Sequence, residues 1–217
     1  MKDIAIYGAG GFGREVACLL RHINSVGSEH WNLVGFFDDG KEIGFDNGYG
    51  KVIGGMDALN AYSCPLSVVI SIGTPRTLKT LVEKIDNPNV DFPNIIAPNV
   101  LFFDPESTEI GRGNIITFGC RLSCDTHLGD FNVLNGCISF GHDVHIGDFN
   151  VFMPEARLSG EVCAGNMNLF GARSFVAQQV KIGSSTTIGA GSIVLRRTKD
   201  NSLYLGCLLY TSDAADD

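Results

Sequence analysis

The sequence predicts a small α/β, Rossmann-like domain followed by a parallel β-helix. Strand-like and helix-like apolar segments alternate over residues 1–95, and such alternation is typical of a parallel sheet. From Ile110 the hydrophobic pattern takes a period of six, which no α-helix has and which is a known signature of β-helices. We therefore expect domains at 1–95 and 96–206. The remaining residues, 207–217, fit neither pattern, and we interpret them as an atypical, truncated or artefactual tail.

The first 95 residues contain about three strand–helix units. Short apolar strands are expected at 2–8, 33–39 and 67–73, and helices at 14–23 and 77–85. Three units amount to at most half of a full dinucleotide-binding fold.

Fifteen consecutive hexapeptides begin at Ile110, and each starts with Ile, Leu, Val, Phe or Ala. The fifth position is small or β-branched in every one. Short flat strands with a corner every six residues explain both features, because the first and fifth residues then point inward and the third and fourth lie at the corner. A β-sandwich would instead have irregular strands with turns every 8 to 12 residues.

Composition and charge exclude several classes of partner. The chain is 44% hydrophobic and carries a formal charge of -8, whereas nucleic acids and anionic membranes attract a basic surface. No stretch approaches the roughly 18 apolar residues that span a bilayer, and the N-terminus has the pattern of a strand rather than a signal peptide. We expect no nucleic acid, no membrane and a cytoplasmic location. Seven cysteines without a CxxC pair suggest neither a disulfide framework nor a zinc site.

The segment FGHDVHIGDF at 140–149 holds the candidate catalytic residues. In the hexapeptide register His142 and Asp143 lie at an outward corner, and Gly160 lies one coil above the histidine. A histidine beside a carboxylate can act as a general base, because its pKa lies near neutrality and the carboxylate fixes its tautomer. The alternative is a solvated pair on a turn. His127 and His145 should stack, about 4.8 Å apart. We interpret these two as surface or subunit-contact residues and expect no metal site.

The motif GAGGFG at 8–13 has glycines where GxGxxG requires them, after a strand and at the start of a helix. Helix-terminal amides and close backbone approach suit a phosphate. Asp38 and Asp39 close the second strand, where an acid can accept hydrogen bonds from ribose. Alone, the motif suggests NAD, but no second nucleotide half follows; a tight turn without a ligand is the other alternative.

Together these motifs resemble the hexapeptide-repeat acyltransferases. The segment GHDVHIGDF, with Leu-Asn seven residues before its histidine, is similar to bacterial sugar acetyltransferases of the sialic acid O-acetyltransferase type, which include N-acetyltransferases acting on UDP-linked 4-amino sugars. The resemblance covers residues 2–206. It implies a left-handed β-helix with three hexapeptides per coil, and so about five coils, although general crossover rules favour the right hand.

The resemblance also implies roles for individual residues. His142 would be the base, Asp143 its orienting partner, and Asn135 a polar residue near that histidine. It implies a homotrimer with acetyl-CoA between neighbouring β-helices, beside Gly160, Ala172 and Ala190. A nucleotide-activated sugar, such as a UDP-sugar, would contact the N-terminal domain at Gly8, Gly10, Gly11, Gly13, Asp38, Asp39 and Gly73.

We therefore expect an enzyme that transfers acetyl from acetyl-CoA to an amine or hydroxyl of a sugar or nucleotide-activated sugar in bacterial glycan biosynthesis. Two departures from the family bear on this expectation: Val151 replaces a histidine that often contacts CoA, and CLLYTSDAADD replaces a proline-containing turn with a basic end. The alternatives are a non-catalytic nucleotide-sugar-binding β-helix protein, an O-acetyltransferase acting on sialic acid or serine, and an NAD-dependent oxidoreductase.

Overall fold

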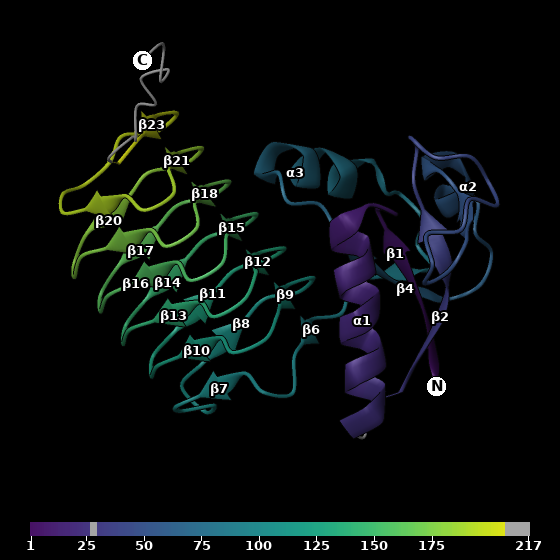
Figure 1. Ribbon diagram of the computed structural model, residues 1–217, viewed down its shortest axis with the longest axis horizontal. Coiled ribbons are helices and arrows are strands. Elements are labelled where there is room, and N and C mark those ends of the chain that lie inside the picture. The colour runs from purple at the N-terminus through teal and green to yellow at the C-terminus, as the bar shows by residue number, and fades with distance from the viewer. Residues whose placement is uncertain (27–29, 207–217) are drawn as a thin grey trace, which may run out of the picture.

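The computed structural model describes residues 1–26 and 30–206, and the tail predicted at 207–217 lies outside the described residues. The N-terminal part contains a five-stranded parallel sheet in the order β3-β2-β1-β4-β5, surrounded by helices (Figure 1). Its elements are β1 (Lys2–Tyr7), α1 (Gly11–Val26), β2 (Trp31–Phe37), β3 (Val52–Gly54), α2 (Met56–Asn60), β4 (Leu66–Ile70), α3 (Pro75–Lys84) and β5 (Val90–Asp91).

The three expected strands and two expected helices are present, and three short elements come in addition. β3, α2 and β5 contain three, five and two residues. Segments this short hold too few residues to show a strand or helix period, so the sequence pattern could not reveal them. β3 and β5 form because they pair with β2 and β4 at the two edges of the sheet.

The rest of the chain forms the left-handed parallel β-helix that the resemblance implied (Figure 1). Its two-residue strands make three faces. The β6 face contains β6 (Ile95–Ile96), β9 (Ile115–Ile116), β12 (Val133–Leu134), β15 (Val151–Phe152), β18 (Leu169–Phe170), β21 (Thr187–Ile188) and β23 (Leu203–Tyr204). The β7 face contains β7 (Leu101–Phe102), β10 (Arg121–Leu122), β13 (Ser139–Phe140), β16 (Arg157–Leu158), β19 (Phe175–Val176) and β22 (Ile193–Val194). The β8 face contains β8 (Glu109–Ile110), β11 (His127–Leu128), β14 (His145–Ile146), β17 (Cys163–Ala164) and β20 (Lys181–Ile182).

The β-helix begins earlier than the hexapeptide count indicated. β6 and β7 precede Ile110, so a coil lies before the fifteen repeats from which about five coils were expected. The chain between β7 and β8 does not keep the six-residue spacing, which explains why the pattern missed this first coil.

The interior follows the predicted register. First-position residues such as Phe140, Phe152 and Phe170 are buried, and the rings of Phe152 and Phe170 stack at 4.4 Å. The fifth positions from Asn114 to Thr198 are all buried as well. Residues 18 apart pair in parallel, so each large side chain rests on its counterpart in the adjacent coil.

The β6 face lies beside the N-terminal domain, with α1 and α3 on the side toward the β-helix (Figure 1). Phe131, Val133 and Val151 belong to the same buried apolar cluster as Ile4 and Leu20 of the N-terminal domain. Val151, where the resemblance implied a histidine, is therefore a core residue, with 1% of its surface exposed.

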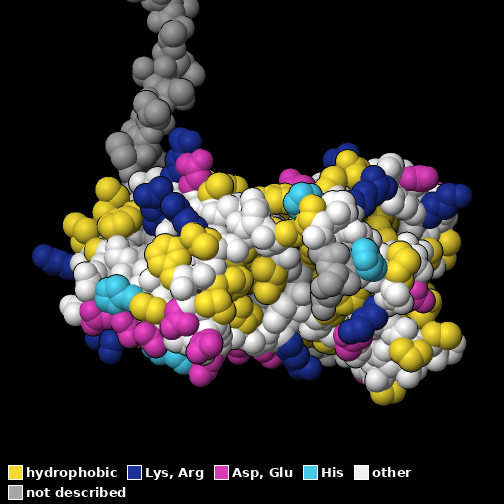
Figure 2. Space-filling view, turned by 90° about the horizontal axis from the view of Figure 1, so that it is seen from below, with side chains coloured by type: hydrophobic (Ala, Val, Ile, Leu, Met, Phe, Trp, Pro, Cys, Tyr) yellow, Lys and Arg dark blue, Asp and Glu magenta, His cyan; other side chains and the backbone are white. Residues whose placement is uncertain are grey.

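The other two faces of the β-helix do not carry the N-terminal domain. Hydrophobic side chains gather on the underside of the β-helix (Figure 2). Leu101, Phe175 and Ile193 are exposed members of a single column on the β7 face. Among the described residues no helix is both long enough and apolar enough to cross a membrane.

From Gly113 to Gly191, the corners of the β-helix each contain one residue in the left-handed region. Every fourth position of the hexapeptides from Gly113 to Gly191 has a φ between 53° and 68°, and most of these residues are not glycine. Such a conformation costs roughly 1–2 kcal/mol for a residue with a Cβ. Hydrogen bonds between coils offset the cost: the N–H of Asp143 donates to the carbonyl oxygen of Cys124 at 3.1 Å, and that of Glu161 to His142 at 2.8 Å.

A ladder of buried asparagines joins the coils from within. The Oδ1 atom of Asn150 accepts the backbone N–H of Asn168 at 2.9 Å. The Oδ1 atom of Asn132 accepts the backbone N–H of Asn150 at 2.8 Å. These side chains are fully buried. The amides therefore satisfy backbone donors that no water reaches.

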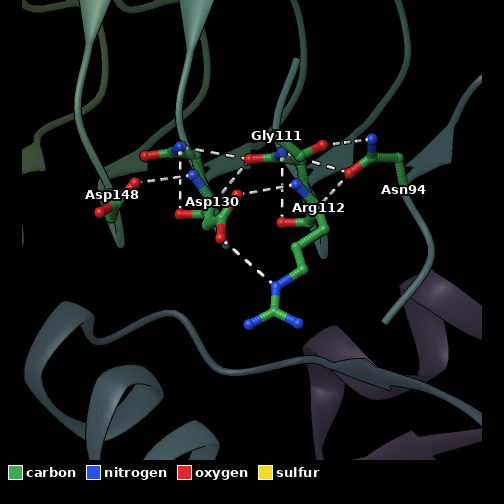
Figure 3. Close-up of polar contacts among 7 residues, drawn as sticks. Asn94, Gly111, Arg112, Asp130 and Asp148 are labelled. Carbon is green, nitrogen blue, oxygen red and sulfur yellow. Dashed lines mark hydrogen bonds and ion pairs between the residues drawn. The ribbon is translucent and has the colours of Figure 1, made fainter. Parts of the chain in front are cut away.

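A second ladder lies on the outside of the same corner (Figure 3). In this ladder each backbone N–H donates to a side chain of the following coil, whereas in the asparagine ladder it donates to the preceding coil. The N–H of Asp130 donates to Oδ1 of Asp148 at 2.8 Å, and the N–H of Arg112 donates to Oδ1 of Asp130 at 2.9 Å. At the start of the ladder, Asn94 donates to the carbonyl oxygen of Gly111. The corner facing the N-terminal domain is thus held by side-chain acceptors from both adjacent coils.

We predict that Asn150→Ala lowers the free energy of unfolding by about 1–3 kcal/mol, because it leaves the buried N–H of Asn168 without an acceptor. Urea denaturation followed by circular dichroism measures the change. The matched control is Asn32→Ala, which removes only an exposed bond to Asp3 and should shift stability by less than about 0.5 kcal/mol. Equal stability of the two variants would contradict a supporting role for the ladder.

Candidate active site

His142 and Asp143 lie at the corner between the β7 and β8 faces. β13 ends just before them and β14 begins just after, so both side chains project outward and are about half exposed. His142 Nδ1 lies 2.7 Å from Asp143 Oδ2. When Nδ1–H donates to this carboxylate, Nε2 is left as a proton acceptor. The structure brings together the pair expected from the sequence.

Gly160 lies beside His142 in the next coil. A Cβ placed on Gly160 would come within 2.5 Å of Nε2 of His142, so the imidazole occupies its position only because residue 160 is glycine. Gly160 is buried, and its N–H has no acceptor among residues 1–26 and 30–206. A proton acceptor and an N–H without a bond therefore lie next to each other.

A carboxylate that the sequence analysis missed lies one coil above Asp143. Glu161 accepts hydrogen bonds from Nε2 of Gln179 and from Nε2 of Gln178, each at 3.0 Å, and these bonds hold the pKa of Glu161 below its usual range. Glu161 thus adds a second carboxylate to the edge that carries His142 and Asp143. The 18-residue spacing from Asp143 is the signal that could have identified Glu161.

Asn135 lies at a different corner, between the β6 and β7 faces. It follows β12, and with Gly136 it lines a cleft of about 240 Å³ against Glu15 and Cys18 of α1. No hydrogen bond joins Asn135 to His142 within the described part of the chain. The expectation that Asn135 is a neighbour of His142 is therefore not met inside a single chain, because seven residues carry the β-helix from one corner to the next.

The residues expected to contact CoA also lie at two different corners of the β-helix. Ala172 and Ala190 occupy successive coils at the corner of Asn135, where the N–H of Gly191 donates to the carbonyl oxygen of Ala172. Gly160 belongs to the corner of His142. The two groups lie along opposite edges of the β7 face.

The glycine motif forms the turn between β1 and α1. Gly8 has a φ of 107°, and a Cβ on Gly13 would overlap the carbonyl oxygen of Gly8. These two glycines allow the turn and its close packing on the helix. Gly10 and Gly11 are exposed, and a Cβ on Gly10 would meet no atom within 4 Å. Gly10 and Gly11 thus leave the backbone open to a ligand.

Asp38 ties the second strand to the glycine turn. Its Oδ2 atom accepts the N–H of Ala9 at 2.8 Å, and its Oδ1 atom accepts the N–H of Gly40. Asp39 accepts the hydroxyl of Tyr7 at 2.5 Å and the N–H of Met56 at 2.8 Å. Both expected ribose acceptors are therefore also structural.

The bond between Tyr7 and Asp39 affects the ionisation of both groups. The Tyr7 hydroxyl, followed by the Met56 N–H, holds the pKa of Asp39 below its usual value, while burial and the Asp39 carboxylate raise the pKa of Tyr7. The sequence analysis treated Tyr7 only as part of a strand. Its role follows from the parallel pairing of β1 with β2, which places Tyr7 opposite Phe37 near the acidic pair.

Gly73 follows β4, the strand next to β1, and is exposed. Ser71, two residues earlier, donates its hydroxyl to the carbonyl oxygens of Tyr7 and Gly8. The segment after β4 therefore supports the glycine turn directly.

The stacked histidines are arranged as the register predicted. The rings of His127 and His145 lie 4.4 Å apart and nearly parallel, and His127 Nε2 lies 3.2 Å from Glu109 Oε2. The described residues contain no group of three or more His, Cys, Asp or Glu side chains that could hold a metal ion.

Comparison with known proteins supports the resemblance seen in the sequence. Residues 3–85 match the family described as the PglD N-terminal domain. No curated protein sequence matches the chain.

Several solved structures match nearly the whole chain. The acetyltransferase domain of PglB from Neisseria gonorrhoeae is 26% identical, with a TM-score of 0.84 over 95% of this chain and 97% of that one. The same domain in complex with acetyl coenzyme A is 27% identical, with a TM-score of 0.81 over 94% of this chain and 96% of that one. A mutant perosamine N-acetyltransferase from Caulobacter crescentus, in complex with CoA and GDP-perosamine, is 23% identical, with a TM-score of 0.82 over 95% of this chain and 94% of that one. These matches confirm the resemblance to hexapeptide-repeat sugar acetyltransferases.

We predict that Tyr7→Phe raises the pKa of Asp39 toward 3.8, because the variant lacks the hydroxyl donor. Carboxyl carbon chemical shifts, followed during an acid titration, measure this pKa in both proteins. A depressed folded-state pKa contributes stability that is fully present above pH 3.8 and is lost as pH falls through the lower value. The stability difference between the proteins should therefore shrink on acidification. An unchanged Asp39 pKa would show that the bond has no electrostatic effect.

Proposed function

We propose that the protein is an acetyl-CoA-dependent acetyltransferase that acetylates an amine or hydroxyl of a nucleotide-activated sugar, such as a UDP-sugar, in bacterial glycan biosynthesis. The observation that carries the proposal is the His142–Asp143 pair beside Gly160, on a β-helix joined to a domain with an open glycine turn. The whole-chain similarity to the Neisseria acetyltransferase domain supports it. We expect the reaction to occur in the cytoplasm.

The proposed chemistry uses His142 as the general base. Nε2 takes the proton from the acceptor nitrogen or oxygen as that atom attacks the thioester carbonyl of acetyl-CoA. Asp143 holds the ring orientation and stabilises the imidazolium that forms during the reaction. When the carbon–sulfur bond breaks, the CoA thiolate leaves and takes the proton from His142.

The N–H of Gly160 is the donor best placed for the developing oxyanion. It has no acceptor in the described part of the chain and lies beside the proposed base. A backbone donor fixed in a buried position stabilises charge without reorganising.

Acetyl-CoA is the co-substrate, and the Neisseria domain is similar to this chain and has been solved with acetyl coenzyme A. Small residues at Ala172 and Ala190 would let the pantetheine approach the backbone. These residues lie on the opposite edge of the β7 face from His142, so one chain does not supply the whole site.

A homotrimer would bring His142 of one copy close to Ala172 and Ala190 of another. Packing of β-helices around a three-fold axis would set the His142 corner of one copy against the Asn135 corner of its neighbour. Phe175 and Ile193 are exposed neighbours in one column of the β7 face, between these corners, and offer apolar surface for such a contact, whereas Arg121, Ser139 and Arg157 separate them from Leu101. Each site would then use the base of one copy and Asn135 of the next.

We predict that His142→Ala lowers kcat/KM by about 10²- to 10⁴-fold while leaving the fold intact. CoA release, measured with a free-thiol reagent against a panel of UDP-4-amino sugars and their hydroxyl analogues, provides the assay and distinguishes N- from O-acetylation. The matched control is His30→Ala, an exposed histidine outside the site, which should retain full activity. Acceptor-dependent CoA release that persists in His142→Ala would rule out this base.

We also predict that inactive Asn135→Ala and His142→Ala chains restore activity to each other when they assemble together. In randomly mixed trimers about a quarter of the sites combine an intact His142 with an intact Asn135 from the neighbouring copy, so about 25% of wild-type activity should return. Refolding each variant alone is the control. Mixed trimers that remain inactive would place both residues in the site of the same copy.

A further inference from the structure

The β7 face carries two exposed arginines. Arg121 begins β10 and Arg157 begins β16, and neither forms an ion pair in the part of the chain that the structure describes. The hydrogen bond and charge of Arg173, with a smaller effect of Arg157, hold the pKa of Glu155 below its usual range. The Glu155 carboxylate is bound by Arg173 at 2.7 Å, however, so Arg157 has only a neighbouring charge and no bonded partner.

Three carboxylates lie along the edge between the β7 and β8 faces. Asp125, Asp143 and Glu161 are 18 residues apart and occupy the same corner of successive coils. His142 binds Asp143, and two glutamine side chains donate to Glu161. The carboxylate of Asp125 accepts no hydrogen bond and forms no ion pair among residues 1–26 and 30–206; only its N–H is bonded, to a serine hydroxyl. This edge is therefore complementary in charge to the two arginines.

The arginines and two of these carboxylates lie at matching levels of the β-helix. Arg121 precedes Asp125 by four residues in one coil, and Arg157 precedes Glu161 by four residues two coils later. Both pairs therefore have the same relation across the β7 face. The side chains of each pair do not meet within their own chain, because the arginine lies on the face and the acid at its edge.

The third carboxylate has a serine at its level instead. Ser139 lies between the two arginines in the β7-face column and precedes Asp143 by four residues. Asp143 is the carboxylate that binds His142, at 2.7 Å. An arginine at this level would compete for that carboxylate, because guanidinium groups bind carboxylates strongly. Arginines thus occur only in the coils whose edge carboxylate is not bound to histidine.

The symmetry of the proposed trimer decides which residues can meet. If the His142 edge of one copy lies against the Asn135 edge of the next, the β7 face that joins these edges turns toward the three-fold axis. Edges that meet along their length require parallel β-helices, and rotation about a parallel axis leaves each coil at its own level. A residue of one copy therefore faces residues of the same coil in its neighbour.

We propose that Arg121 of one copy forms an ion pair with Asp125 of the neighbouring copy, and that Arg157 pairs with Glu161 of the neighbouring copy in the same way. The partner of this surface is thus a second copy of the chain, selected by charge and by level. This inference rests on the proposed function, since it requires sites shared between copies. The pairs would couple assembly to the edge that carries the proposed base.

A charge-reversal cycle on the full chain, followed by analytical ultracentrifugation, tests the pairing. Arg121→Asp and Asp125→Arg should each raise the dissociation constant of the trimer by about 10- to 1,000-fold, because like charges then face each other at three interfaces. The double variant should return the constant close to the wild-type value. The corner accommodates Asp125→Arg, since Arg173 has a φ of 58° at an equivalent position. The matched control, Lys181→Asp, reverses an exposed cation at the same hexapeptide position on the β8 face and should leave assembly unchanged.

CoA release distinguishes an assembly role from a catalytic one. Because each proposed site combines two copies, Arg121→Asp should release little CoA when dilute and recover at protein concentrations that restore the trimer. His142→Ala should stay inactive at every concentration. Activity of Arg121→Asp that does not follow its assembly would contradict the inference.

The outcomes separate the inference from the proposed function. If either single variant assembles as tightly as wild type, or the double variant does not recover, the pairing is wrong, while acceptor-dependent CoA release by wild type leaves the transferase function standing. If wild type is a monomer at concentrations where it releases CoA, the inference and the site between copies both fail. If wild type is a trimer that releases no CoA with any acceptor, the proposed function fails and the charge-reversal cycle still decides the pairing.

Discussion

The hydrogen bonds between residues 18 apart are the constraint on which the rest of this structure depends. A two-residue strand has almost no stability of its own, and a corner residue at positive φ is unfavourable, so a single coil would not persist. Stacking satisfies the backbone of each coil from its neighbours, and the buried asparagines extend this pairing to donors inside the corner. The same bonds hold the candidate site, since the N–H groups of Asp143 and Glu161 both donate to the preceding coil.

This regularity determines what the site contains. Stacking sets Gly160 against the imidazole of His142 and Glu161 above Asp143, so the proposed base, its proposed orienting carboxylate, a second acid and a backbone N–H without an acceptor in the described residues share one edge. The same stacking places Asn135, Ala172 and Ala190 at the other edge of the β7 face. A helix with three corners cannot gather all of them in one copy, which is why the proposed chemistry requires neighbouring copies. The N-terminal domain covers the β6 face and leaves the β7 face available for that contact.

The architecture could be predicted from the sequence because the residues that fill the β-helix core recur at a fixed interval. First and fifth positions are buried, and their six-residue period is visible without any structure. The left-handed corners were not visible, because residues such as Glu155 and Arg173 occupy them without any turn signature. The first coil, β3 and β5 were missed because their segments are too short or irregularly spaced. At the sites, the motif identified His142, Asp143 and the glycines, whereas Tyr7 and Glu161 depend on contacts between segments far apart in the chain.

A structure of the trimer with CoA and a uridine nucleotide bound would test most directly whether the site forms between copies around His142. We expect the CoA sulfur to lie in a groove between two copies, within about 3–4 Å of Nε2 of His142 and beside the N–H of Gly160, with Asn135 of the neighbouring copy lining the same groove. A CoA sulfur bound away from the His142 corner, or within a groove formed by a single copy, would contradict this arrangement.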